Sequence, residues 1–432
     1  MKLFKTTAYA LAAAVAMCAF SACGGNDDDN GGITPPDPIP SPDPVEGILS
    51  AEDAKEYVED TAIDFIGLFD ARDQEAIVNL ADFVAEHYGD LDFPDLGDSE
   101  DYALSPKNFT QALAAAVRTH TFNPLSRASY EYDIKFSDFA GVYEPGRYAW
   151  EKISGSNDII FRFRGPSGNC ELKVSASGNS AVIEDYDDEY DETIRVHIPR
   201  NVNITLTEGS TVHANIAVVN ELNMSGHSYF VSVNGTVANL GVKAESRGSD
   251  SQLSESQALS VNGRTILTST ATINGRNMLN PDVIDNLDED DYTSLFTNGS
   301  ASANIMGNIE VRTQVKSVAN IVKVGENTYF DNWDEYSQSE ALNLCRRACE
   351  TINSNIVADV YFGGNNSVQA SVIFQPELDD YASYWSVEAV PVIKYAADGS
   401  TQSFDDALDG FNLGKIEHQW EALVNSYRRL FR

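Results

Sequence analysis

The sequence has few positively charged residues. Its 29 Lys and Arg stand against 66 Asp and Glu, which gives a formal net charge of −37 over 432 residues. Nucleic-acid binding needs clustered Lys and Arg to neutralise phosphates, and electrostatic attachment to anionic lipid headgroups needs the same residues. The composition therefore predicts a soluble, strongly acidic protein that has no nucleic-acid partner and is not held at a membrane by charge.

Motifs of the common catalytic classes are also missing. The sequence contains neither Gly-x-Ser-x-Gly nor His-Glu-x-x-His, its six histidines are scattered, and it carries no Rossmann or P-loop fingerprint. Glycoside hydrolysis needs two acids placed across a sugar, but 66 acidic residues do not single out a pair. We predict a non-enzymatic protein with no catalytic residue and no cofactor. A carboxylate-dependent polysaccharide hydrolase is the alternative.

Cysteine is scarce as well. Beyond Cys23 the chain has only Cys170, Cys345 and Cys349, too few for a disulfide framework. Cys345 and Cys349 lie four residues apart on a predicted helix, and this spacing favours buried thiols over metal ligands. We predict no metal site. A disulfide between Cys170 and one of the other two stays open.

The N-terminus carries the most informative pattern that is present. Lys2 and Lys5 precede an apolar stretch over residues 8–20, and Ser21-Ala22-Cys23 follows. The stretch is shorter than the roughly 20 residues that span a bilayer, but it has the length of a signal-peptide core. The segment resembles a bacterial lipobox, which implies that residues 1–22 are a signal peptide and that Cys23 is lipidated. An ordinary secretory signal is the alternative.

Asp27, Asp28 and Asp29 follow the cysteine. This tract resembles the export signal of surface lipoproteins of Bacteroidota, which implies a lipid-anchored protein of the outer membrane, exposed at the cell surface. A plain acidic spacer is the alternative, and the leaflet that displays the protein stays open. Residues 31–47 contain six prolines, which fix φ and remove donors. We therefore expect residues 23–47 to be an extended tether of about 3.1 Å per residue.

Residues 48–128 are predicted to form a helical region. Ser50, with Asp53 three positions later, is typical of a capped helix start, and apolar residues then recur at helical spacing. A second amphipathic helix is predicted to end at Gly89, and a third, shorter helix to span 109–118.

Residues 129–432 are predicted to form an antiparallel β-rich domain. Apolar and polar residues alternate over many short runs, and four pairs between them have the composition of type I′ hairpin turns. These pairs are Asn234-Gly235, Asn262-Gly263, Asn274-Gly275 and Asp398-Gly399. Helical spacing returns near 334–353 and at 415–431, and the wide apolar stripe of the terminal helix is expected to pack on the sheet.

The expected fold class is therefore α+β. It combines a large curved antiparallel β-meander, as a half-barrel or a split sheet, with an N-terminal helical pair, an inserted helix and a C-terminal amphipathic helix. A sheet of a dozen or more strands must curl or split. The many small residues at strand positions favour strong curvature and a concave, partly open shape.

Aromatic residues near turns and acidic residues are the candidates for ligand binding, because exposed aromatic rings beside carboxylates stack on sugars and hydrogen-bond to them. The alternative is that these rings face the core. The candidates are Tyr143, Tyr148, Trp150, Tyr381, Tyr384 and Trp385.

Together these patterns predict a membrane-anchored lipoprotein whose β-rich domain binds a ligand or partner without catalysis. A curved sheet suits a hydrophobic small molecule, and the aromatic residues suit a glycan; the sequence does not rank the two. A structural or assembly lipoprotein is a further alternative. Oligomeric state and ligand identity stay open.

Overall fold

The computed structural model describes much of the chain from Val45 onward. The described residues are 45–89, 91, 130–187, 192–284, 286–287, 292–381, 384–404, 406–407 and 413–430. The predicted signal peptide, the lipidation site Cys23, the acidic tract Asp27 to Asp29, nearly all of the tether and the predicted helix 109–118 lie outside the described residues.

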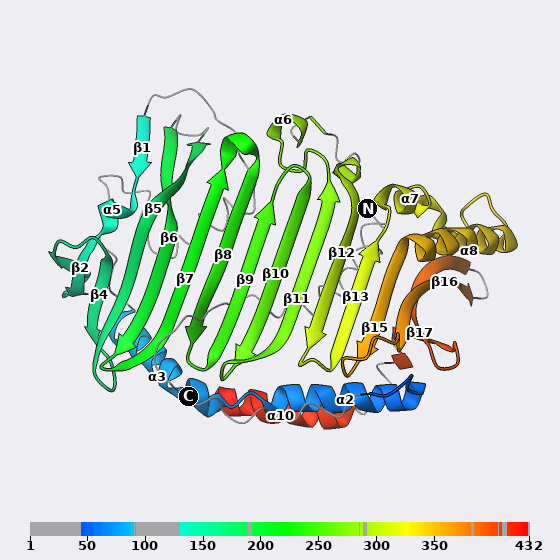
Figure 1. Ribbon diagram of the computed structural model, residues 1–432, viewed down its shortest axis with the longest axis horizontal. Helices are drawn as coiled ribbons and strands as arrows, with labels where there is room; N and C mark the ends of the chain where they lie inside the picture. The colour runs from blue at the N-terminus through cyan, green and yellow to red at the C-terminus, as the bar shows by residue number, and fades with distance from the viewer. Residues whose placement is uncertain are drawn as a thin grey trace.

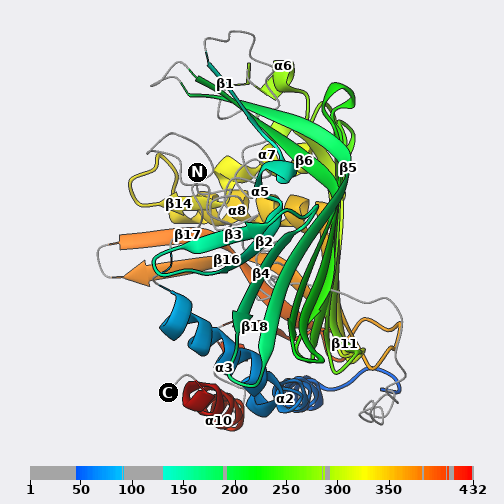
Figure 2. The same cartoon turned by 90° about the vertical axis from the view of Figure 1, so that its left-hand side faces the viewer.

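The described strands form one open, curved sheet of 18 strands (Figures 1 and 2). They are β1 (Tyr130–Ile134), β2 (Gly141–Pro145), β3 (Trp150–Ser154), β4 (Ile159–Arg164), β5 (Asn169–Asp187), β6 (Glu192–Glu208), β7 (Thr211–Asn223), β8 (Ser228–Val237), β9 (Leu240–Gly248), β10 (Gln252–Val261), β11 (Arg264–Gly275), β12 (Phe296–Ile305), β13 (Ile309–Val315), β14 (Tyr329–Asp331), β15 (Ile356–Phe362), β16 (Ala370–Tyr381), β17 (Tyr384–Tyr395) and β18 (Thr401–Ser403).

Helices and short turns accompany the sheet. They are α2 (Ala51–Gly67), α3 (Ala71–Tyr88), α5 (Phe136–Phe139), η1 (Met224–Gly226), α6 (Pro281–Ile284), η2 (Tyr292–Leu295), α7 (Val318–Val322), η3 (Gly325–Asn327), α8 (Gln338–Asn355) and α10 (Leu413–Leu430). The predicted N-terminal pair, inserted helix and terminal helix correspond to α2 and α3, α8, and α10. None of the described helices has the length and apolar character needed to cross a membrane.

Strand pairing confirms the antiparallel meander. From β4 to β13 each strand pairs with the next one along the chain in antiparallel register. Two short pairings are parallel, β1 with β6 and β2 with β4. In the first, β1 pairs with residues Glu192 to Val196 of β6, beyond the point where β7 ends.

The sheet nearly divides at β15. This strand pairs with β13 over seven residue pairs but with β16 over only two, Asp359 with Ser371 and Val360 with Ala370. The β16–β17 hairpin then leaves the main sheet (Figure 2), and β14 and β18 add to the outer edge of β17. The sheet therefore both curves and nearly splits, as expected for so many strands.

Two of the four predicted hairpin turns are correct. Asn262 and Gly263 both have positive φ and join β10 to β11, and the β17–β18 connection contains Asp398 and Gly399. The prediction for Asn234-Gly235 is wrong, because the pair lies inside β8.

Close approach of backbones explains this difference. A Cβ on Gly235 would meet the Ile216 backbone of β7, so glycine is needed there for strand contact. The turn after β8 contains Ala238, which has φ 52°. The prediction for Asn274-Gly275 is also wrong. Both residues belong to β11, and a Cβ on Gly275 would meet the Leu295 carbonyl oxygen.

The two faces of the sheet differ in chemistry, because successive side chains of a strand point to opposite faces. One face carries polar residues in register across neighbouring strands. Examples are Thr205, Asn215, Ser232, Thr270 and Ser302. The other face carries mostly apolar residues. Examples are Ile204, Ile216, Val233, Leu259 and Val311. The apolar face is the concave one, because α2 and α8 pack on it (Figure 2).

The helices cover the apolar face along its rim (Figures 1 and 2). Near the strand ends, α2 packs through Tyr57 and Phe65. At one end of the sheet, α8 buries Cys345 and Cys349 against β16 and β17. At the other end, Tyr88 of α3 packs on the cluster around Trp150. Helix α10 lies against α2 and α3, so the prediction that it packs directly on the sheet is wrong.

Candidate functional site

The central part of the concave face is the first candidate site. On the strands that pack under α2, side chains of the concave face become more exposed with distance from that helix. In β11, Leu267 is 9 % exposed, while Ile273, three positions further along the same face, is 37 % exposed. In β10, Val261 is buried in a cluster with Phe65 of α2, while Leu253 at the other end is half-buried. The side chains beyond the helical rim therefore keep contact with solvent.

The exposed part of this face is largely aliphatic. On β7 and β8 the half-buried side chains are Ile216, Val218, Val231 and Val233. Toward β12 the same face carries small residues such as Ala271 and Ala301. The same face also carries Glu255 and Gln257 of β10, opposite Ala271 and Ser269 of β11. The face is therefore mainly aliphatic with polar groups on β10, and its chemistry suits a largely apolar ligand.

The first group of predicted binding aromatics is mostly buried. Tyr143 is 1 % exposed and Trp150 is 7 % exposed. Both pack with Phe161, and the Tyr143 hydroxyl donates to the Phe139 carbonyl over 2.7 Å. The prediction that these two residues contact a ligand is therefore wrong, and the core alternative holds. Tyr148, in the turn between β2 and β3, is 68 % exposed and has the Arg147 guanidinium over its ring.

The second group lies at the β16–β17 hairpin. The hydroxyl oxygens of Tyr384 and Tyr329 are 3.0 Å apart. Trp385, on the opposite face of β17, packs against the core cluster of α8. Tyr381 pairs with Tyr384 in the strand register, and its side chain lies outside the described part. The structure thus places the half-buried Tyr384 beside a tyrosine that the sequence did not point to.

Trp333 is the residue that sequence reasoning missed. It lies in the turn between β14 and α8 and is 83 % exposed. Tyr336 in the same turn is 47 % exposed and packs edge-on against Phe330. The predicted helix of 334–353 included Tyr336. The capping box of Ser337 and Glu340 starts α8 at Gln338. This sequence signal could have shown that Tyr336 precedes the helix.

Trp333 sits on a turn fixed by hydrogen bonds. Its backbone N–H donates to Asp331 Oδ1 over 2.8 Å, and the Asp331 N–H donates to Asp334 Oδ2 over 2.8 Å. The Asn332 N–H donates to the Trp385 carbonyl over 3.2 Å, which ties the turn to β17. We call Tyr329, Asp331, Trp333, Asp334 and Tyr384 the β14 patch.

A buried polar cluster lies beneath α3. Glu208 Oε2 is 3.2 Å from His213 Nε2, and Glu208 Oε1 accepts the N–H groups of Ser167 and Gly168. Cys170 lies beside this carboxylate. Burial, together with the Glu208 charge, raises the pKa of the Cys170 thiol to about 11. The thiol therefore stays protonated near neutral pH and does not act as a nucleophile.

A groove of about 570 Å³ opens above this cluster. It is lined by Arg72, Glu75, Ala76, Asn79, Asp82, Phe83, Glu86, Pro166, Ser167 and Glu208. Glu208 and Ser167 belong both to the groove lining and to the buried cluster, and the Glu208 oxygens already accept hydrogen bonds from the protein. The groove therefore presents mainly exposed helix carboxylates.

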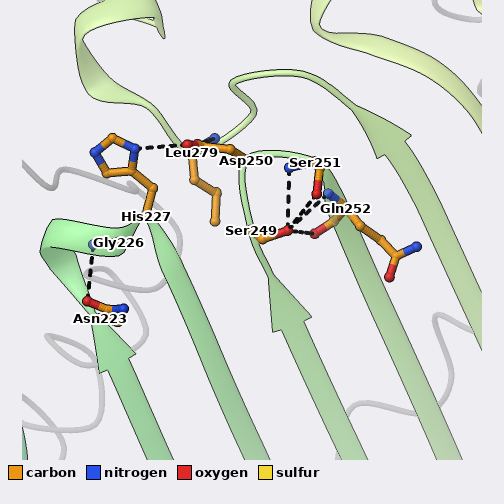
Figure 3. A network of polar contacts seen from close by, with 8 residues as sticks. All are labelled: Asn223, Gly226, His227, Ser249, Asp250, Ser251, Gln252 and Leu279. Carbon is orange, nitrogen blue, oxygen red and sulfur yellow. Dashed lines mark hydrogen bonds and ion pairs between the residues drawn. The ribbon is translucent and has the colours of Figure 1, made fainter.

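A His–Asp pair lies at the opposite rim of the sheet (Figure 3). His227 Nδ1 is 3.0 Å from Asp250 Oδ2, and Asp250 Oδ1 accepts the Leu279 N–H. In Figure 3 the second ring nitrogen of His227 points away from Ser249 and Ser251. The pair therefore joins the turns at this rim and does not form a Ser–His–Asp triad with the drawn serines.

The described part of the chain holds neither a metal-binding cluster nor a disulfide. Within the described residues, no group of three or more His, Cys, Asp or Glu side chains is arranged to hold a metal ion. Cys170, Cys345 and Cys349 are free and buried, so the disulfide that the sequence left open does not form here.

Comparisons with known proteins give little guidance. No protein-family model matches the chain, and no curated protein matches it. A solved structure, a porin-like protein from Bacteroides vulgatus ATCC 8482, is 10 % identical. The match covers 60 % of this chain and 89 % of that one, with a TM-score of 0.14. A likeness at that score carries no inference about fold or function.

Proposed function

We propose that this protein is a lipid-anchored binding protein of the outer membrane whose concave sheet face takes an apolar small molecule. The observation that carries the proposal is the loss of burial along that face, from 9 % exposure at Leu267 to 37 % at Ile273 on one strand. A sheet with one apolar face is stable in water only when that face is covered. A bound apolar molecule would provide such cover.

The polar outer face supports this reading. Exposed ion pairs lie on it, including Arg162 with Glu171 and Arg312 with Glu310. Such a face stays hydrated and keeps the domain soluble. Most apolar side chains of the strands lie on the inner face, although Val219 and Phe230 lie on the outer one. The helical rim leaves the centre of the inner face half-exposed, as at Val218 and Val233. A hydrated polar outer face and an apolar inner face are typical of proteins that shield a hydrophobic ligand.

The lipobox resemblance at Cys23 and the tether of residues 23–47 support the anchor. An acyl chain on Cys23 would hold the protein at a membrane, and a proline-rich tether would let the folded part move away from the bilayer surface. The strongly acidic composition would oppose further contact with anionic headgroups. The apolar face would then be available to a ligand rather than to the bilayer.

The test is native mass spectrometry of the mature chain, residues 23–432, with Cys23→Ser to prevent acylation. We expect protein from a bacterial host to carry additional mass that organic extraction removes. The extracted protein should then bind N-phenyl-1-naphthylamine, an apolar probe whose fluorescence rises on transfer from water.

A matched pair of variants on β8 locates the site. Val233→Asn places an amide on the concave face and should weaken probe binding about tenfold, because a buried amide without a partner costs roughly 1–3 kcal/mol. Ser232→Asn changes the opposite face and should bind the probe as wild type does. A bare polypeptide mass together with no probe binding would refute the proposal.

A further inference from the structure

We propose that the β14 patch is a carbohydrate-binding site for neutral oligosaccharides. It is separate from the concave face, because Tyr329, Asp331 and Tyr384 lie on the face of β14 and β17 turned away from the α8 core, while Phe330 and Val387 lie on the core face. The proposal does not depend on a ligand in the concavity.

The solvent exposure of Trp333 is the first observation that supports a sugar site. An indole that is 83 % exposed leaves a large apolar ring in water, although burial of an aromatic ring is favourable. The ring is carried by a turn that three hydrogen bonds hold in place, from the N–H groups of Trp333, Asp331 and Asn332. A ring presented on an ordered backbone loses less entropy on binding than one on a mobile loop. The apolar face of a pyranose is a flat partner for such a ring.

A pair of tyrosine hydroxyls lies on the same face of β14 and β17 as Asp331. One of the two hydroxyls donates to the other over 3.0 Å, and a hydroxyl oxygen has lone pairs that can accept a hydrogen bond from a sugar hydroxyl. The hydrogen bond with Tyr384, burial and the nearby Asp331 and Glu388 carboxylates raise the pKa of Tyr329. Tyr329 therefore stays protonated at physiological pH.

Charge selects the class of sugar. Asp331, Asp334 and the exposed Glu388 surround the patch, and the sequence from Glu326 to Cys345 contains no Lys or Arg. Carboxylates accept hydrogen bonds from neutral hydroxyl groups but repel uronic acids and sulfated sugars. The same charges disfavour a protein partner, because the centres of protein interfaces are depleted in charged residues.

The experiment measures binding of the full-length protein, purified in detergent, to a panel of oligosaccharides by isothermal titration calorimetry. The neutral probes are maltohexaose, cellohexaose, xylohexaose and mannohexaose, and the acidic probe is a galacturonic acid hexamer. We expect at least one neutral probe to bind and the acidic probe not to bind. Trp333→Ala should lower the affinity for the bound probe at least tenfold, and Tyr384→Phe by about threefold.

Trp420→Ala is the matched control, because Trp420 is a second exposed tryptophan, 52 % exposed on α10. It should leave the affinity unchanged. Circular dichroism of each variant establishes that the fold is retained, which the exposure of both side chains leads us to expect. Failure of all four neutral probes to bind, preference for the acidic probe, or equal affinities of the Trp333→Ala and Trp420→Ala variants would overturn the proposal. Capture of a protein by the patch with no sugar binding would overturn it in favour of a protein partner.

Discussion

Glu208 and His213 form a carboxylate–imidazole pair that is almost completely buried. Oε2 of Glu208 lies 3.2 Å from Nε2 of His213, and the two side chains are 6 % and 5 % exposed. The other carboxylate oxygen accepts the N–H groups of Ser167 and Gly168 over 2.7 and 3.1 Å. The pair therefore joins the β4–β5 turn to the start of β7 beneath α3, and each oxygen of the buried carboxylate has a partner.

Replacing this carboxylate should destabilise the protein. In Glu208→Gln the amide N–H₂ must face either the Ser167 and Gly168 N–H groups or the imidazole, so one set of hydrogen bonds is lost. We expect the free energy of unfolding to fall by about 3 kcal/mol, the range for breaking a buried pair. Urea denaturation followed by circular dichroism measures it. Glu221→Gln, which removes an exposed ion pair with Arg200, should cost less than about 1 kcal/mol.

The same carboxylate affects Cys170. With a pKa of about 11, caused first by burial and then by the Glu208 charge, the thiol should be alkylated by iodoacetamide at pH 8 roughly two orders of magnitude more slowly than in urea. Peptide mass spectrometry after timed labelling distinguishes Cys170 from Cys345 and Cys349. Labelling of Cys170 in the native protein at the rate seen in urea would show that the thiol is accessible and ionised.

The features that the sequence predicted correctly depend on neighbours in the chain. The start of α2 follows from the hydrogen bond between the Ser50 side chain and the Asp53 N–H, and the two faces of the sheet follow from simple alternation. The Asn262-Gly263 turn is equally local, because positive φ at both positions requires only those two residues.

The features that the sequence predicted wrongly depend on distant parts of the chain. Gly235 is required because the Ile216 backbone of the neighbouring strand comes too close for a Cβ. The Asn-Gly pair therefore reflects strand contact and not a turn. Trp150 is buried because Tyr88, from a helix 62 positions earlier, packs on it. Burial of this kind cannot be derived from spacing, and the same holds for the exposure of Trp333.

The end of the tether is held by Gln369, which is 1 % exposed. Its Oε1 accepts the Leu49 N–H over 2.9 Å, and its Nε2 donates to the Gly47 carbonyl over 2.8 Å. Gln369→Ala removes both bonds and should lower the free energy of unfolding by about 2 kcal/mol. It should also speed proteolytic cleavage between Val45 and Ser50. Gln375→Ala on β16, the strand that begins directly after Gln369, is the control. Equal cleavage rates in the two variants would contradict the role of Gln369.

Asp70 gives a pH dependence with a defined sign. The Arg72 side chain, and then its backbone N–H, hydrogen-bond the carboxylate at the start of α3 and lower the pKa of Asp70 from 3.8 to about 2. A carboxyl whose pKa is lower in the folded state stabilises the protein above the unfolded pKa. That contribution disappears as the pH falls through the folded pKa. The stabilisation by Asp70 should therefore be complete above about pH 5 and be lost between about pH 4 and pH 2.

Asp70→Asn tests this sign, because the amide oxygen can still accept the Arg72 N–H while the charge is lost. The difference in free energy of unfolding between wild type and variant, measured in urea, should be constant from pH 5 to 7 and shrink toward zero as the pH approaches 2. Arg72→Gln should weaken the same pH dependence, since the Arg72 side chain is its main cause. If wild type and Asp70→Asn lose stability in parallel below pH 4, the Asp70 carboxylate does not contribute through its ionisation.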